Sequence, residues 1–224
     1  MSDMKIKTKS KLLSILLPER CPYCSAVIKP NETACVYCLE NLPNENLQKS
    51  ILGIYKLTGT VYYEGKYRNA ILGIKSGEGL QFAYQLGALM CEKLRENVAE
   101  PDFDVITFVP MHKDDLMKKG FNHSEVLAKA ISEILDIPCE ALLKKTKKNS
   151  PQHKLPAHKR AKNVEGVYKA INKSLVKGRK ILVVDDIITT GHTLSECARV
   201  LEEKEANNIH FLTFAVSIPK NDLK

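Results

Sequence analysis

The chain has 224 residues, 44% of them hydrophobic, so it can bury one core of ordinary size and is not a wholly disordered protein. No apolar run approaches the roughly 20 residues that cross a membrane, and Leu12–Leu17 is short and lacks a small-residue cleavage site. We therefore expect a cytoplasmic protein without a transmembrane segment.

The formal net charge of +8 is unevenly distributed along the chain. Between Lys144 and Lys180 there are thirteen lysines and arginines against one acidic residue, Glu165. A local positive field of this kind indicates a phosphate-bearing partner. A solvated lysine face is the alternative, but the near absence of Asp and Glu favours a functional surface.

The first predicted element is a short amphipathic helix over Lys5–Leu17, which ends before Pro18. Its apolar stripe is expected to pack on the protein itself, and docking to a membrane surface is the alternative. Two Cys-x-x-Cys turns follow, ten residues apart, formed by Cys21, Cys24, Cys35 and Cys38. Four thiolates on two facing turns suit tetrahedral zinc with no open coordination site, so this zinc is expected to be structural. A thioredoxin-like redox pair would need one such turn opening a helix after a strand.

The rest of the chain alternates predicted strands and helices. Strands are predicted at Ile51–Tyr55, Thr60–Glu64, Asp104–Val109, Val164–Lys169, Lys180–Val184 and Ile209–Val216, with a turn at Thr58-Gly59 between the first two. Helices are predicted at Tyr67–Ile74, Leu80–Leu94 and Leu194–Glu203, and a further helix that runs to Leu135 is predicted to begin at an Asn122 N-cap, with Glu125 completing a capping box. The aperiodic stretch Lys144–Arg160 predicts a loop or a loosely paired excursion. This order indicates an α/β fold with a parallel sheet flanked by helices on both faces, and ligands bind such sheets at the carboxyl ends of the strands. Val109–Gly120 and Asp185–Thr193 should therefore share one rim.

The string Ile181–Thr193, ILVVDDIITTGHT, carries the strongest chemical signal. A buried strand delivers two carboxylates, Asp185 and Asp186, and a helix then opens at Thr189, Thr190, Gly191, His192 and Thr193. Unpaired backbone N–H groups at a helix start favour a phosphate, and glycine lets the backbone approach it closely. Carboxylates beside a phosphate site suit a ligand with hydroxyls at its other end, so we predict a phosphorylated ribose. No Walker A lysine pattern or GxGxxG is present, which argues against an ATPase or a dinucleotide enzyme.

This string resembles the signature of the type I phosphoribosyltransferases, and the chain is most similar to the ComF competence-protein family. The resemblance extends to the four-cysteine ribbon and to several short pieces: Tyr63-Glu64-Gly65 with Arg68 and Lys75, Val109-Pro110, Gly120-Phe121-Asn122, Pro151-Gln152 with Leu155, and Arg160 with Asn163 and Gly166. It implies a type I phosphoribosyltransferase-like fold with two parts. Residues 1–44 would form the basic helix and zinc ribbon, and residues 45–224 the phosphoribosyltransferase-like domain.

The resemblance also implies roles for individual residues. Asp185 and Asp186 would hold the ribose hydroxyls of phosphoribosyl pyrophosphate, and Thr189 to Thr193 its 5′-phosphate. The loop near the pyrophosphate would include Pro110, Met111, His112 and Lys113, with Lys154 and Arg160 reaching it from the basic loop. Magnesium would bridge the pyrophosphate and the ribose hydroxyls, as expected for a hard, oxygen-ligated cation. A homodimer, common in this superfamily, is a further implication.

Two positions depart from the family pattern, which often has arginine where this chain has Lys119 and glutamine where it has His123. Lysine lacks the planar fork of arginine, so bidentate phosphate binding is not expected there. The resemblance leaves three functions open. The first is a phosphoribosyltransferase acting in natural transformation, and the second a non-catalytic protein that binds single-stranded DNA and DNA-uptake proteins, peripheral to the inner membrane. The third is a regulator that senses phosphoribosyl ligands.

Overall fold

The computed structural model describes residues 18–29, 32–42, 47–51, 55–77, 80–98, 101–148 and 164–217, with the backbone alone for residues 48–51. The predicted helix at Lys5–Leu17 and most of the basic loop lie outside these residues. Within them, no helix is both long and apolar enough to cross a bilayer.

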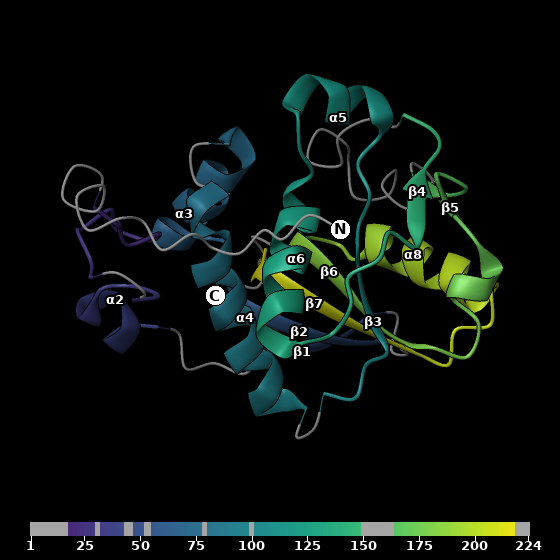
Figure 1. Cartoon of the computed structure of the whole chain (residues 1–224), viewed down its shortest axis with the longest axis horizontal. Coiled ribbons are helices and arrows are strands. Elements are labelled where there is room, and N and C mark those ends of the chain that lie inside the picture. Colours follow the sequence, from purple (N-terminus) through teal and green to yellow (C-terminus); the bar gives the residue numbers. More distant parts are fainter. Residues whose placement is uncertain are drawn as a thin grey trace.

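A five-stranded sheet forms the centre of the molecule, in the order β1-β2-β7-β6-β3 (Figure 1). Its strands are β1 (Leu47–Ile51), β2 (Tyr55–Tyr62), β3 (Val105–Phe108), β6 (Lys180–Ile188) and β7 (Asn208–Val216). All neighbouring strands run parallel except β1, which pairs antiparallel with β2 at one edge. The predicted helix-flanked parallel sheet is confirmed, with this antiparallel edge added.

Helices cover both faces of the sheet. On one face lie α3 (Gly65–Ser76), α4 (Ala83–Asn97), which follows the short turn η1 (Leu80–Phe82), and α6 (His123–Leu135); the other face carries α8 (His192–Glu202). A small antiparallel pair, β4 (Leu143–Lys145) with β5 (Tyr168–Ala170), packs on the same side of the sheet as α8. The two remaining short elements are the helix α5 (Lys113–Lys119), which follows β3, and the 3-10 helix η3 (Lys173–Leu175), which precedes β6.

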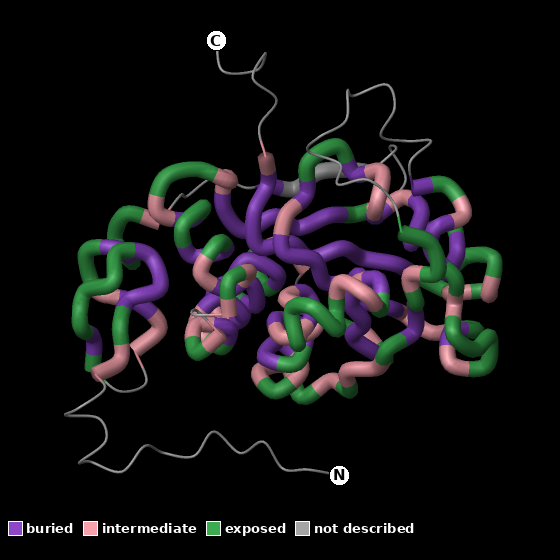
Figure 2. Tube along the Cα trace, turned by 90° about the horizontal axis from the view of Figure 1, so that it is seen from above, coloured by how far each residue is buried: buried purple, intermediate pink, exposed green. Residues whose placement is uncertain are grey.

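The side chains of β6 show why helices must pack on both faces of the sheet. Leu182 and Val184 join the hydrophobic cluster on one face, while Ile181 and Val183 join the cluster on the other. Successive strand residues point to opposite faces, so an uninterrupted apolar run is stable only when both faces are buried. Figure 2 shows the strands as a continuous buried band through the middle of the molecule.

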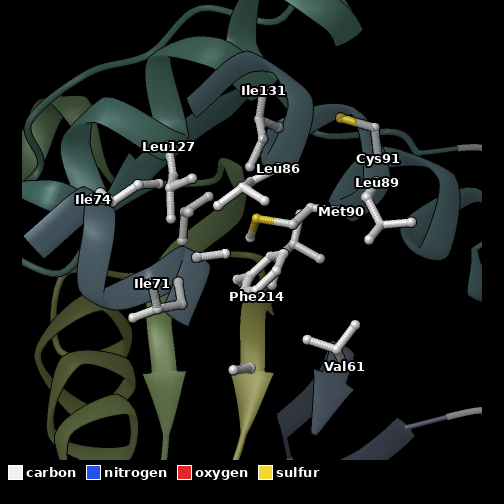
Figure 3. Packing of buried hydrophobic residues seen from close by; sticks show 14 of the residues in the cluster. Val61, Ile71, Ile74, Leu86, Leu89, Met90, Cys91, Leu127, Ile131 and Phe214 are labelled. Carbon is white, nitrogen blue, oxygen red and sulfur yellow. The ribbon is translucent and has the colours of Figure 1, made fainter. Parts of the chain in front are cut away.

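The helices α3, α4 and α6 pack together on one face of the sheet and form a hydrophobic core with it. Ile71, Leu86, Met90 and Leu127 are fully buried there, and Figure 3 shows them gathered around Phe214 of β7. The packed side chains therefore hold these helices in place. A charged residue at the end of one of these helices is held in place with it.

The predicted turn at Thr58-Gly59 is wrong, because both residues lie inside β2. Thr58 and Thr60 are fully buried and β-branched, which favours a strand. Gly59 serves close packing instead of a turn: a Cβ at this position would lie 2.3 Å from Val216 Cγ2 and 3.3 Å from Leu47 Cβ. Glycine in a strand commonly marks such an approach.

We predict that Gly59→Ala lowers the free energy of unfolding by about 1–3 kcal/mol, because the added methyl overpacks the contact with the stiff side chain of Val216. Urea unfolding of the two proteins measures the difference. Lys56→Ala, at an exposed position of the same strand, is the control and should change stability by no more than about 0.5 kcal/mol. Equal stability of Gly59→Ala and wild type would show that this approach is not tight.

Candidate functional site

The two acidic residues of the signature lie inside β6, which continues to Ile188 and so extends beyond the predicted strand end at Val184. Asp185 pairs with Thr213 of β7 in the parallel register. Both acidic residues are buried: 8% of the surface of Asp185 and 5% of that of Asp186 are exposed. The sheet thus delivers two adjacent carboxylates to its carboxyl edge. Such a pair is stable only if other groups compensate the lost hydration.

Asp185 is held by the start of α6. Its Oδ1 accepts hydrogen bonds from Ser124 Oγ at 2.8 Å and from the backbone N–H of Asp186 at 2.9 Å. Asn122 caps the same helix, accepting from Ser124 N at 3.1 Å, and donates from Nδ2 to the carbonyl of Val109 at 3.0 Å. The backbone N–H of Val109 in turn donates to Val184. The ends of β3 and β6 and the start of α6 therefore form one unit, as the shared rim requires.

Asp186 is held by two cationic or potentially cationic groups. Lys75 Nζ lies 2.6 Å from its Oδ2, and His123 Nε2 lies 3.7 Å from the same oxygen. Burial lowers the pKa of His123, which favours its neutral form. Lys75 is therefore the principal positive charge beside the Asp186 carboxylate. The buried Nδ1 of His123 has no hydrogen-bond partner in the described part of the chain.

These different surroundings separate the two carboxyl groups in acidity. Burial, together with the neighbouring charge of Asp186, raises the pKa of Asp185 to about 8. Burial opposes ionisation of Asp186 as well, but Lys75 and His123 outweigh it and lower that pKa. Near neutral pH the pair therefore carries one proton and one negative charge, as closely coupled carboxyl groups usually do.

A short loop joins β6 to α8 and forms the second half of the site. Thr189 and Thr190 are exposed, whereas Gly191 is buried with φ of +79° and caps the helix. The first N–H groups of the helix have no intrahelical acceptor and carry the positive end of its dipole. A hollow beside them is lined by Asp185, Ile187, Ile188, Thr189, Gly191, Thr193 and Leu194. One hollow thus touches both a carboxylate and the helix start.

The residues that follow β3 occupy the neighbouring part of the rim. Pro110 and His112 are buried, Met111 is partly buried, and Lys113 is exposed. His112 Nδ1 accepts from the backbone N–H of Asp114 and caps α5. The sequence predicted a loop up to Lys113, and the short helix that follows it was not expected. Its signals were acidic residues in the first turn, Lys118 and Lys119 in the last turn, and a left-handed Gly120 at the end.

The base of the basic loop lies next to α8. Thr146 donates from its backbone N–H to Val167 O at 2.8 Å, and Gly166 donates to Glu196 Oε1 at 2.8 Å. Glu196 is buried and is also held by Arg199. Residues 149–163, including Lys154 and Arg160, lie outside the described residues, so the structure places only the two ends of this segment beside the site.

The four cysteines of the ribbon come together as predicted. Their Sγ atoms all lie within 4.8 Å of one another, and Cys21 and Cys38 are buried. Four sulfurs at Zn–S distances of about 2.3 Å would lie roughly 3.8 Å apart in a tetrahedron, close to the 3.6 Å between Cys24 and Cys35. The donor set therefore fits a four-coordinate zinc ion without large rearrangement.

The ribbon, which includes helix α2 (Val36–Glu40), packs against the first turn of α3 (Figure 1). The rings of Tyr23 and Tyr67 meet edge to face at 5.4 Å, and the Tyr67 hydroxyl donates to the carbonyl of Asn41 at 3.1 Å. Lys66 Nζ lies 5.8 Å from the centre of the Tyr37 ring. The helix that carries Lys75 at one end is thus in contact with the cysteine cluster at the other.

Two residues of the site, Lys75 and Ser124, could not be assigned a role from the sequence. Lys75 entered only as part of the resemblance, without a role, and Ser124 was not considered. Lys75 is far from the signature in sequence, and no spacing rule links it to Asp186. Ser124 lies directly after the Asn122 cap, and only the packing of α6 on the end of β6 brings its hydroxyl to Asp185.

We predict that the pKa of Asp185 makes the protein less stable as pH rises. This carboxyl loses its proton near pH 3.8 in the unfolded chain and near pH 8 when folded, so the folded state holds the proton more tightly. Stability should therefore fall between these pH values, by at most about 1.4 kcal/mol per pH unit. Asp185→Asn has no such proton and should show a flatter profile.

Urea unfolding midpoints at pH 6 and pH 9, in buffer without magnesium, measure this difference. Asp136→Asn is the matched control, because Asp136 has a left-handed backbone with φ of +55° that asparagine also tolerates. Parallel pH profiles for Asp185→Asn and wild type would show that Asp185 does not hold its proton more tightly in the folded protein.

The chain is similar to known proteins in the part that contains the carboxylate pair and the Gly191 loop. Residues 122–222 match the family model described as phosphoribosyl transferase domain. Competence protein F of Haemophilus influenzae is 31% identical over 102 residues, covering 45% of this chain and 44% of that protein. DNA utilization protein YhgH of Escherichia coli strain K12 is 31% identical over 99 residues, covering 44% and 43%. The chain thus aligns with under half the length of these relatives.

Among solved structures, an adenine phosphoribosyltransferase is similar at 20% identity with a TM-score of 0.42, covering 62% of this chain and 71% of that one. The matched residues 122–222 contain the start of α6, the carboxylate pair and the Gly191 loop. Residues 122–222 thus match a phosphoribosyl transferase domain, and over part of its length the chain is similar to competence protein F and to DNA utilization protein YhgH.

Proposed function

We propose that this protein binds phosphoribosyl pyrophosphate with magnesium and transfers its phosphoribosyl group to an acceptor. The observation that carries the proposal is one hollow at the end of β6 that is lined by both Asp185 and the Gly191 loop. A helix start suits a phosphate, and a carboxylate pair suits a diol. A phosphorylated sugar presents both groups in one small ligand.

The ligand is assigned to the site in three parts. Its 5′-phosphate would lie at Thr189, Thr190, Gly191, His192 and Thr193, and its ribose hydroxyls at Asp185 and Asp186. The pyrophosphate would extend toward Pro110, Met111, His112 and Lys113, with Lys154 and Arg160 as further contacts. Magnesium suits a site of carboxylate, hydroxyl and pyrophosphate oxygens, and it would offset the charge of the leaving pyrophosphate.

The carboxylates would also act on the reaction itself. In the transfer, the bond from the anomeric carbon to pyrophosphate breaks and a bond to the acceptor forms, with positive charge developing on the sugar between the two events. The ionised Asp186 and its neighbour are buried, and a fixed negative charge in a buried site stabilises such a cation more strongly than water does.

Calorimetric titration of phosphoribosyl pyrophosphate in the presence of magnesium tests the proposal. We expect saturable binding by the wild-type protein and at least a hundredfold loss in the Asp185→Asn, Asp186→Asn double variant, which replaces one oxygen of each carboxyl group by an amide donor and removes the negative charge. Asp136→Asn is the matched control and should bind normally. Absence of wild-type binding at millimolar ligand would exclude the proposed function.

We assign the cysteine ribbon, within residues 1–44, a structural zinc ion, and residues 45–224 the phosphoribosyltransferase domain. Four thiolates leave no position for a substrate, so this metal holds the ribbon together. We predict about one zinc per chain by elemental analysis, lost in Cys21→Ser, Cys24→Ser together with ribbon order. Cys91→Ser, which changes a buried cysteine of α4, is the control and should keep the metal. A ribbon that stays ordered without metal would contradict the assignment.

Handling of DNA is the second candidate role, favoured by the names of the relatives and by the ribbon surface. Tyr37 is 71% exposed beside Lys66, and an exposed ring next to a cation suits the stacking of single-stranded bases. The two roles use different surfaces and can coexist. If phosphoribosyl pyrophosphate does not bind, DNA binding becomes the leading proposal, and its affinity should fall steeply with salt.

A further inference from the structure

Each carboxylate of the pair has one oxygen committed to the protein. Asp185 Oδ1 accepts from Ser124 and from a backbone N–H, while Asp186 Oδ2 lies against Lys75 and His123. The second oxygen of each group is then the one that a ligand can use. Asp186 is the ionised acceptor, while Asp185 holds the proton of the pair and can also donate it in a hydrogen bond. A ribose diol would contact both groups at once, so the orientation of both carboxyl groups matters for binding.

The two carboxylates are oriented in different ways. Asp185 is fixed by two hydrogen bonds from groups on rigid elements, one of them the backbone of its own strand. Among the described residues, Asp186 is contacted by charged or ionisable side chains, and Lys75 at 2.6 Å lies closer to its carboxylate than His123 at 3.7 Å. Removing that ammonium would leave a buried carboxylate with no strong partner, free to rotate or to take up a proton.

Lys75 can hold this position because its helix is fixed. It lies in the last turn of α3, whose residues Ile71 and Ile74 are fully buried in the core of Figure 3. Gly77 ends the helix in a left-handed conformation and donates its N–H to Ile74 O. The side chain of Lys75 is 30% exposed, so its stem packs on protein while its ammonium reaches the end of the sheet.

We propose that Lys75 is a positioning residue for the ribose: it orients Asp186 toward the sugar hydroxyls and does not itself bind the pyrophosphate. The proposal rests on the proposed function, because it concerns the same ligand. It assigns to α3, outside the matched domain, a part of the sugar site. It also predicts that the effect of Lys75 depends on the hydroxyl groups of the ligand.

Three probe ligands separate this role from a direct phosphate contact: ribose 5-phosphate, 2-deoxyribose 5-phosphate and magnesium pyrophosphate. We expect Lys75→Met to weaken ribose 5-phosphate by roughly ten- to a hundredfold, the usual size for a charged hydrogen bond. The deoxy ligand, which offers one hydroxyl less to the carboxylates, should be weakened much less. Pyrophosphate should bind both proteins equally, and Lys75→Arg should restore most of the affinity for ribose 5-phosphate.

Lys129→Met is the matched control, because it removes a lysine from a surface ion pair with Glu125 on α6 and should bind every ligand as the wild type does. Thermal melts confirm that each variant is folded, and Lys75→Gln replaces Lys75→Met if the latter is not. A loss that is equal for both sugars, or a loss of pyrophosphate binding, would overturn the positioning role. Wild-type protein that binds no sugar phosphate would instead refute the proposed function, and the inference with it.

Discussion

Two adjacent buried carboxylates at the end of a central strand are the constraint around which this molecule is arranged. Burying both as free anions would be strongly unfavourable, so the fold surrounds them with compensating groups from separate elements. The start of α6 provides a hydroxyl, β6 its own backbone N–H, and α3 an ammonium. The result is one shared proton and one charge, which is a suitable state for binding a diol.

Helix α3 connects two features that the sequence presents as unrelated. Its first turn contacts the cysteine ribbon through Tyr67, and its last turn places Lys75 against Asp186. The ribbon and helix α3 share one hydrophobic cluster, which includes Cys21, Cys38, Ile71 and Ile74. A structural metal in the ribbon would therefore help to fix the helix that carries Lys75.

Most of the fold could be predicted from the sequence because hydrophobic periodicity and caps are local signals. The apolar runs of β6 and β7 and the Asn122 cap of α6 are of this kind. The errors arose where local residue types had a nonlocal cause. Gly59 suggested a turn, but it is required by the side chain of Val216 on a neighbouring strand. The short helix α5 lacks an apolar stripe, and only its charges and Gly120 indicated it.

The same distinction applies to the site. By itself the sequence determined the string that gives a strand, two carboxylates and a helix start, and it determined the four cysteines, because each of these depends on residues close together in the chain. The tertiary structure alone decided that Asp185 and Asp186 differ in acidity, and that Lys75 and Ser124 are their partners. Burial and ion pairing are properties of elements packed against one another, and no spacing along a single chain specifies them.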